Sequence, residues 1–435
     1  MGQRLARRER ERGGRLYHQQ RAEEAVEKWN HSLTKLRDPR DRFQVSGDLC
    51  RALCELGKSR EALEHAGHQC GLATEIGEPA MLAEAHLNMA LCNVRSCEFS
   101  KAVSYCRSAM QHQPEGGAIT GYLHLCLGDA FMGLSELQKA WSNYMRAHAM
   151  AHNLADRVLE VQVHASMSHI YSALNDHDSA IACCHAAQQL SEDVGKQRVP
   201  PEVAGAVTRF RRRLATIIAR PYRKIGRYNE AMDYCEDAMK VALLHGDRPV
   251  QAECLFSFAD IHRKRCDMER AQPRYESAYS IMTEIADRLG QSRVLGGLAK
   301  VAATTGQHDK AIELNEKALA IAQKIGNKME MLRCHARLQV LYDVKGDATL
   351  THRHESVLRQ LCDEMDLFCG VCDDVMGSTP EKVEPLQCGH FIHGRCVQHL
   401  ARSTLGRSGR PRPCPACRRH ASQNPLQAPD VMALT

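Results

Sequence analysis

Residues 127–147 read LGDAFMGLSELQKAWSNYMRA, and this stretch decides the fold. Ala140 and Ala147 stand seven residues apart, about two turns of an α-helix, so both lie on one helix face. Small side chains at these positions allow this helix to pack closely against the one before it. Tyr144, which lies between the two alanines, is large enough to fill the remaining groove. The stretch therefore predicts a pair of closely packed helices.

The same alanine spacing recurs along the chain. Alanines follow one another at intervals near 40 residues, at Ala25, Ala62, Ala102, Ala140, Ala180, Ala231, Ala271 and Ala311. In six units a second alanine follows seven residues later, at Ala109, Ala147, Ala187, Ala238, Ala278 and Ala318. Together with Leu127, Gly128, Phe131 and Tyr144, this pattern resembles the tetratricopeptide repeat, in which each unit is a pair of helices.

The repeats predict a mainly α protein built as a tetratricopeptide-repeat helical solenoid of about eight units over residues 13–345. Such a solenoid presents an extended concave groove that holds partners, and it has no catalytic chemistry of its own. A bundle of unrelated amphipathic helices is the alternative, but a bundle would not show a recurring period.

One interval breaks the period. Ala180 and Ala231 are 51 residues apart, and three prolines lie in or near the extra length, at Pro200, Pro201 and Pro221. Proline inside a helix removes a hydrogen bond and bends or ends the helix. We therefore expect the solenoid to be irregular near residues 195–222, with a break or bend between its fifth and sixth units.

The C-terminal region holds eight metal-ligand residues in the order C-x2-C-x15-C-x1-H-x2-H-x2-C-x17-C-x2-C. One zinc ion takes four ligands, so eight ligands predict two ions. The short interval from Cys388 to Cys396 favours an interleaved arrangement. We predict that the first zinc is bound by Cys369, Cys372, His393 and Cys396, and the second by Cys388, His390, Cys414 and Cys417. Both sites are closed by protein ligands, so the ions would be structural, with no open position for catalysis.

The order and type of these ligands resemble the RING-H2 zinc finger, which would span residues 368–420. Val371, Pro415 and Arg418 stand where this family makes contact with a ubiquitin-conjugating enzyme, so the resemblance implies a possible contact there. The stretch from Val397 to Pro413 departs from the family, because its Gly/Arg/Pro-rich end is typical of a flexible loop. Residues 421–435 are expected to form a flexible tail.

Residues 346–367 lie between the solenoid and the finger. Leu350, His354, Val357, Leu361 and Met365 fall near heptad spacing, but they cover barely two heptads. The segment is therefore either a short amphipathic or coiled-coil helix that binds a partner, or a last helix that caps the solenoid.

Residues 1–12 have features of a lipid anchor. Gly2 is the acceptor position for N-myristoylation, although Ala6 stands where the motif prefers Ser or Thr. One myristoyl chain binds a bilayer only marginally, so a second attraction is needed. The neighbouring arginines would supply it at the anionic inner leaflet, at Arg4, Arg7, Arg8, Arg10, Arg12 and Arg15. The alternative is the solvated start of a helix.

Composition excludes several other classes. The chain has 435 residues, 43% of them hydrophobic, and a net charge of +6, short of what a dedicated nucleic-acid binder carries. A nucleic-acid role resting on the arginines of residues 407–419 is therefore weak. The basic run RFRRR at 209–213 is expected to be a solvated helix face.

There is no signal peptide, long apolar run or nucleotide-binding motif, so we expect a cytosolic, reducing compartment. Of 20 cysteines, 14 lie outside the zinc array and are expected to be free thiols.

The whole arrangement resembles the rapsyn family of synaptic scaffolds. The resemblance is closest in HGDRPVQAECLFSFADIHR at 245–263 and PRYESAYSIMTEIADRLGQ at 273–291. It implies a myristoylated peripheral protein on the cytoplasmic face of the postsynaptic membrane, which self-associates and clusters nicotinic acetylcholine receptors through their cytoplasmic loops. It also implies links to dystroglycan and the cytoskeleton through the finger, and ligase activity toward receptor subunits. The alternative is a soluble RING-type ubiquitin or NEDD8 ligase whose repeats select substrates.

Overall fold

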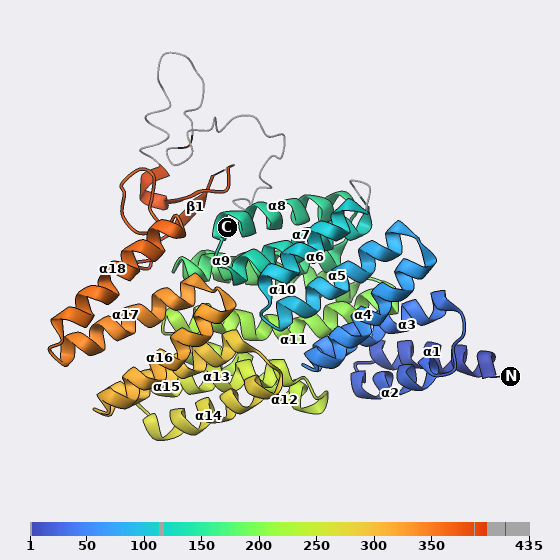
Figure 1. Cartoon of the computed structure of the whole chain (residues 1–435), viewed down its shortest axis with the longest axis horizontal. Helices are drawn as coiled ribbons and strands as arrows, with labels where there is room; N and C mark the ends of the chain where they lie inside the picture. Colours follow the sequence, from blue (N-terminus) through green and yellow to red (C-terminus); the bar gives the residue numbers. More distant parts are fainter. Residues whose placement is uncertain (1, 113–116, 387, 398–413, 415–435) are drawn as a thin grey trace, which may run out of the picture.

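Helices follow one another in antiparallel pairs through nearly the whole chain (Figure 1). The computed structural model describes residues 2–112, 117–386, 388–397 and 414. In these residues there are eighteen helices and one two-stranded sheet. The helices of the first five pairs are α1 (Gly2–His18), α2 (Ala22–Leu33), α3 (Pro39–Glu55), α4 (Ser59–Ile76), α5 (Pro79–Arg95), α6 (Phe99–Gln111), α7 (Ala118–Gly133), α8 (Leu137–Asn153), α9 (Arg157–Ala173) and α10 (His177–Lys196). They are followed by α11 (Pro201–Lys224), α12 (Tyr228–Leu244), α13 (Arg248–Lys264), α14 (Met268–Glu284), α15 (Arg288–Thr304), α16 (His308–Ile325), α17 (Lys328–Val344) and α18 (Ala348–Glu364).

The alanine spacing marks the second helix of each of the first eight pairs. All eight alanines of the lattice, from Ala25 in α2 to Ala311 in α16, are 0% exposed. The alanines seven residues later are also buried, and so are Tyr144, Cys184, Cys235 and Tyr275 between them. The predicted mainly α repeat fold is therefore confirmed. The described residues contain nine pairs, because α17 and α18 form a last pair without these alanines.

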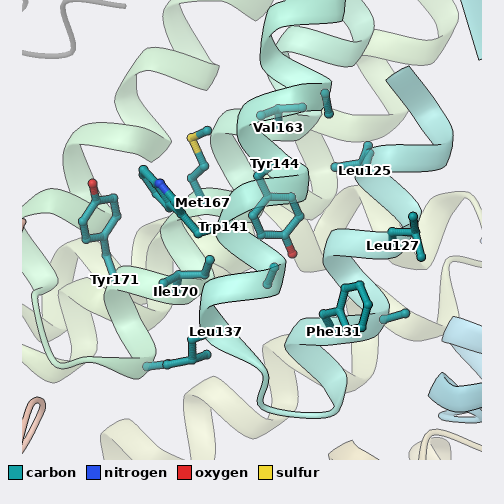
Figure 2. Close-up of a cluster of buried hydrophobic side chains, with 14 of the residues drawn as sticks. Leu125, Leu127, Phe131, Leu137, Trp141, Tyr144, Val163, Met167, Ile170 and Tyr171 are labelled. Carbon is teal, nitrogen blue, oxygen red and sulfur yellow. The ribbon is translucent and has the colours of Figure 1, made fainter. Parts of the chain in front are cut away.

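The pair that contains residues 127–147 shows why the pattern is specific. A Cβ atom on Gly128 in α7 would lie only 2.3 Å from the ring of Tyr144 in α8. The Tyr144 hydroxyl donates a hydrogen bond of 2.8 Å to Asp129, so its polar end is satisfied inside the core. Figure 2 shows Tyr144 among the apolar side chains of α7, α8 and α9, including Phe131 and Met167. Glycine at position 128 is thus a packing requirement.

Short turns join most of the helices at regular intervals. From α12 to α18 a new helix begins every 20 residues, and a residue with positive φ lies in each turn, as at Gly246 and Gly306. An aspartate then caps several of the helices that follow, since its carboxylate accepts a hydrogen bond from a backbone N–H of the first turn. Asp247, Asp267 and Asp287 are examples.

The solenoid curls until its two halves touch (Figure 1). Asn327, before α17, donates a hydrogen bond of 2.8 Å to the carbonyl of Gly133, and the N–H of Met329 donates one of 2.8 Å to the hydroxyl of Ser135. Farther along the same contact, Arg288 and Glu98 form an ion pair at 2.8 Å. The concave groove is therefore more enclosed than the open surface expected from the repeats alone.

The irregular interval near residues 195–222 is a four-residue connection followed by a long helix. α10 ends at Lys196, and α11 then runs for 24 residues with Pro221 inside it. The proline lies three residues before the end of α11, so it interrupts only the last turn of hydrogen bonding. The expected break is confined to the connection, because α11 packs against both α10 and α12.

The prediction that the basic run 209–213 is a solvated face was wrong for Arg209 and Arg212, although Arg211 is exposed. Arg209 pairs with Glu55 at 3.0 Å and lies 3.9 Å from the centre of the Tyr17 ring, and its side chain is 11% exposed. Arg212, 10% exposed, lies 3.8 Å from Asp247. The curl of the superhelix brings α1 against α11, and this contact could not be read from the helix period.

The first and last helices of the solenoid are also packed. Ala6 in α1 is 0% exposed, and its carbonyl accepts a hydrogen bond of 2.8 Å from Ser32, so the boundary proposed at residue 12 falls inside a folded helix. At the other end α18 packs on α17, with Leu361 and Cys362 buried. This packing favours the capping helix for residues 346–367. None of the described helices is both long and apolar enough to cross a membrane.

Candidate metal centre

The first predicted zinc group comes together directly after α18. The ligand atoms of Cys369, Cys372, His393 and Cys396 lie within 4.8 Å of one another, and all but Cys372 are buried. Cys369 and Cys372 lie on one turn, His393 ends the strand β2 (Phe391–His393), which pairs antiparallel with β1 (Val383–Pro385), and Cys396 lies on the helical turn directly after β2. Three thiols and an imidazole are a donor set that suits tetrahedral zinc.

The turn around Cys369 is shaped for a thiolate. Its backbone is closed by a hydrogen bond of 2.9 Å from the N–H of Asp373 to the carbonyl of Cys369, and Asp373 has a positive φ of 57°. Burial alone would raise the pKa of the Cys369 thiol, but backbone N–H groups that point to its sulfur outweigh burial and lower this pKa. Zinc binds the deprotonated form, so the turn favours the state that a ligand needs.

The second group is described in part. Cys388, His390 and Cys414 have ligand atoms within 4.8 Å of one another, whereas Cys417 lies outside the described residues. Gly389 separates the first two ligands and has a φ of +87°, which residues with a side chain rarely adopt. The Nε2 atom of His390 lies 3.2 Å from a carboxylate oxygen of Asp366. A carboxylate in this position commonly orients a metal-binding histidine.

The described residues therefore fit one four-ligand metal site and three ligands of a second, and the zinc ions, the fourth ligand Cys417 and the closure of the second site remain predictions. Of the three residues proposed to contact a conjugating enzyme, Val371 is half-buried beside the first group. Pro415 and Arg418 lie outside the described residues, as do residues 398–413 and the tail. That contact stays a prediction as well.

The described part of the predicted finger, residues 368–386 and 388–397, is seated on the solenoid at the turns around α8, α9 and α10. Phe391 packs against Trp141 with ring centroids 5.6 Å apart, and Trp141 in turn packs against Tyr171 at 5.7 Å. The backbone N–H of Val383 donates a hydrogen bond of 2.9 Å to Asp176, the residue that also caps α10. The zinc region and the repeats thus share one apolar core.

Trp141, Asp176 and Asp366 were not found as functional residues from the sequence. Asp366 is 24 residues from His390, and Gln138, which donates a hydrogen bond of 2.5 Å to Asp366, is 228 residues from it. No local motif carries such pairs. The one available signal was the size of Trp141, which is larger than the repeat requires at that position.

Family models match the N-terminal region and several of the repeats. The model "Rapsyn N-terminal myristoylation and linker region" matches residues 1–80, and tetratricopeptide-repeat models match residues 161–194, 213–284 and 259–324. The chain is 36% identical over 423 residues to the 43 kDa receptor-associated protein of the synapse from Tetronarce californica. It is 39% identical over 421 residues to the protein of the same name from Gallus gallus. Each alignment covers 96% of this chain and 98% of the relative.

Solved structures share the fold at much lower identity. A Rap protein complexed with competence and sporulation factor has a TM-score of 0.55 at 12% identity, covering 75% of this chain and 89% of that one. The Rap conjugation gene regulator of plasmid pLS20, in complex with the Phr* peptide, has a TM-score of 0.53 at 12% identity, covering 84% and 96%. These likenesses support the superhelical repeat fold.

Proposed function

Because this chain belongs to the rapsyn family, that of the 43 kDa receptor-associated protein of the synapse, we propose that it is a receptor-clustering scaffold. In this proposal it is a peripheral protein on the cytoplasmic face of the postsynaptic membrane, where it clusters nicotinic acetylcholine receptors and links them to the cytoskeleton. The similarity over 96% of the chain, from the N-terminal region to the finger, carries the proposal.

The membrane contact is assigned to Gly2 and the arginines of α1. A myristoyl group on Gly2 would start at the N-terminus of α1, which lies at one end of the long axis of the molecule (Figure 1). Ala6, which departs from the preferred acceptor motif, is buried against α2 and is needed there as a small residue. Arg7 and Arg10 pair with Asp41, so the remaining arginines carry most of the attraction to anionic lipid.

The receptor contact is assigned to the enclosed inner face of the solenoid. Ion pairs connect successive first helices there: Arg223 with Asp260 at 3.0 Å, and Arg293 with Glu253 at 2.9 Å. Several further cations have no carboxylate within 4.0 Å among the described residues, including Arg213, Arg220, Lys224 and Lys300. Both lysines are exposed inside the enclosed face, where desolvation by the surrounding helices, together with neighbouring cations, lowers the pKa of Lys224 to about 7 and that of Lys300 to about 8. Such a surface suits an acidic segment of a receptor cytoplasmic loop.

The finger is assigned the cytoskeletal contact, through dystroglycan, and two zinc ions would hold its surface in shape. Its described strands, β1 and β2, lie toward the end of the long axis opposite to α1 (Figure 1). Separate positions for the membrane anchor and the finger fit a protein that bridges two structures. Self-association through the repeats would extend the bridge into a cluster.

Co-expression with nicotinic receptors in a cell that lacks them tests this function. We expect the intact chain to gather surface receptors into patches, Gly2→Ala to abolish membrane association and patches, and Cys388→Ala to keep membrane association while losing cytoskeletal attachment. Lys240→Ala, at an exposed position on α12, is the control. Receptors that stay evenly spread with the intact, membrane-bound chain would rule out the scaffold.

A RING-type ubiquitin or NEDD8 ligase is the second candidate. The half-buried Val371 beside the first ligand group favours it, since the finger family uses this position to recruit a charged conjugating enzyme. It predicts self-modification by the zinc-loaded chain, reduced by Val371→Arg but not by Lys240→Ala. No modified product, in an assay where a known ligase works, would remove this candidate.

A further inference from the structure

Three cysteines outside the finger come together between α3 and α5. Cys50 and Cys54 are four residues apart on α3 and therefore face the same way, and Cys92 approaches them from α5. The sulfur of Cys92 lies 3.3 Å from that of Cys50 and 3.6 Å from that of Cys54. All three sulfurs lie within 4.8 Å of one another, so a single ion could contact them together.

The surroundings of this trio exclude most water. Cys50 is 1% exposed and Cys92 is 0% exposed, whereas Cys54 is partly exposed. Buried side chains of Leu49, Leu53 and other residues of the N-terminal core pack around them. The site is therefore a desolvated cluster of three sulfurs, in which Cys54 is the least buried residue.

The packing of α3 against α5 does not by itself require three cysteines at one point. Elsewhere in the solenoid, cysteines at helix contacts meet in twos, as Cys235 of α12 and Cys254 of α13 do. Such pairs behave as small apolar residues that fill the groove. A third thiol at the same point adds nothing to the fit of two helices, but it completes a ligand set.

The chemistry of that set selects the ion. Thiolates are soft ligands that prefer Cu⁺, Zn²⁺ or iron–sulfur clusters. Structural zinc is almost always bound by four ligands, and among the described residues this group contains only three. We propose that Cys50, Cys54 and Cys92 form a three-thiolate site for the soft monovalent cation Cu⁺, independent of the zinc finger and of receptor binding.

The charges near the trio fit this occupant. Three thiolates and one Cu⁺ leave two negative charges, and two guanidinium groups, those of Arg95 and Arg213, lie close enough to act on Cys54. Hydrogen bonds from Cys50 and Cys92, together with these two cations, lower the pKa of the Cys54 thiol. The same sulfur contacts raise the pKa of the Cys50 and Cys92 thiols, so the ion itself must displace their protons. Binding forms three Cu–S bonds, releases the remaining thiol protons to solvent and changes no oxidation state.

Titration of the full-length, zinc-loaded chain with Cu⁺ tests the site. The titration is done without oxygen, with Cu⁺ buffered by a coloured competing chelator and zinc release followed by an indicator dye. We expect the chain to take up one Cu⁺ before any zinc is released, with a thiolate-to-copper absorption band and only sulfur neighbours in the X-ray absorption spectrum. Copper uptake that occurs only as zinc leaves the finger would overturn the proposal.

Serine variants locate the site. Cys92→Ser and Cys54→Ser should each weaken Cu⁺ binding by at least about 10- to 100-fold, because the loss of one of three ligands should cost no less than the loss of an outer-shell partner. Cys54 is partly exposed, so Cys54→Ser keeps the test meaningful if Cys92→Ser unfolds the first repeats. Cys254→Ser, at an equally buried thiol outside the trio, is the matched control and should bind Cu⁺ like the natural chain. Unchanged Cu⁺ affinity in folded Cys54→Ser would contradict the assignment.

Discussion

Phe391 of the finger packs edge-on against Trp141 of α8, with ring centroids 5.6 Å apart and ring planes at 74°. Phe391 lies directly after one predicted zinc ligand, His390, and two residues before another, His393. The aromatic contact therefore connects the loop that carries predicted zinc ligands to the core of the repeats. Unfolding of the loop is therefore expected to change the surroundings of Trp141.

Removal of zinc should change the environment of Trp141. Without metal the finger has too little core to keep its fold, so Phe391 would leave the indole ring. We expect a strong chelator to shift the tryptophan emission to longer wavelength, and added zinc to reverse the shift. The chain has two tryptophans, so Trp141→Phe, which leaves only Trp29, is the control. A shift of equal size in Trp141→Phe would show that the finger is not coupled to α8.

The alanine lattice predicts where the solenoid rejects larger side chains. Ala311 of α16 is 0% exposed, whereas Ala320 of the same helix is exposed. Ala311→Leu should destabilise its repeat by about 1–3 kcal/mol through overpacking, and Ala320→Leu should change little. Native-state hydrogen exchange of α15 and α16 measures the difference. Equal effects of the two substitutions would contradict the packing described for these helices.

Glycines in the helices should also differ in whether they tolerate a side chain. Gly128→Ala would place a Cβ atom 2.3 Å from the Tyr144 ring, so we expect a loss of about 1–3 kcal/mol in the stability of α7 to α9. A Cβ atom on Gly67 of α4 would meet no other atom within 4 Å, so Gly67→Ala should stabilise α4 by about 1 kcal/mol. Equilibrium unfolding with urea compares the two variants, and a stable Gly128→Ala protein would be the contrary result.

Acid should destabilise the inner face through His169. Burial, followed by the charges of Arg220 and Arg293, lowers the pKa of His169 from 6.5 to about 3. The unfolded chain therefore binds a proton below pH 6.5 that the folded chain rejects, so the contribution is complete above pH 6.5 and falls by about 1.4 kcal/mol per pH unit on acidification toward pH 3. His169→Gln should flatten the dependence of stability on pH between 6.5 and 4.5, relative to a baseline at pH 7.5. An unchanged slope would show that other groups control this range.

The sequence predicted the repeats well, because their packing is local. Ala140, Tyr144 and Ala147 act through helices that follow one another directly, and spacing records such contacts. The grouping of Cys369, Cys372, His393 and Cys396 could also be predicted, because the four ligands of one ion must lie close together, and the structure brings these four residues together. The zinc ions themselves and the ligand role of Cys417 remain predictions.

Contacts between distant parts of the chain could not be predicted from the sequence. The closure between Asn327 and Gly133, the burial of Arg209 against Tyr17, and the seat of the finger at Asp176 all join residues more than 150 positions apart. They depend on the small rotation from each repeat to the next, which accumulates over the solenoid and leaves no mark in the composition of a single unit.

The lateral mobility of nicotinic receptors in a supported bilayer tests the central claim most directly. Purified receptors would be tracked before and after addition of the N-myristoylated chain, with the Gly2→Ala chain as control. We expect the myristoylated chain to slow receptor diffusion and gather receptors into immobile patches, and Gly2→Ala to leave them mobile. Receptors that diffuse freely beneath a dense layer of bound, myristoylated chain would contradict the scaffold function.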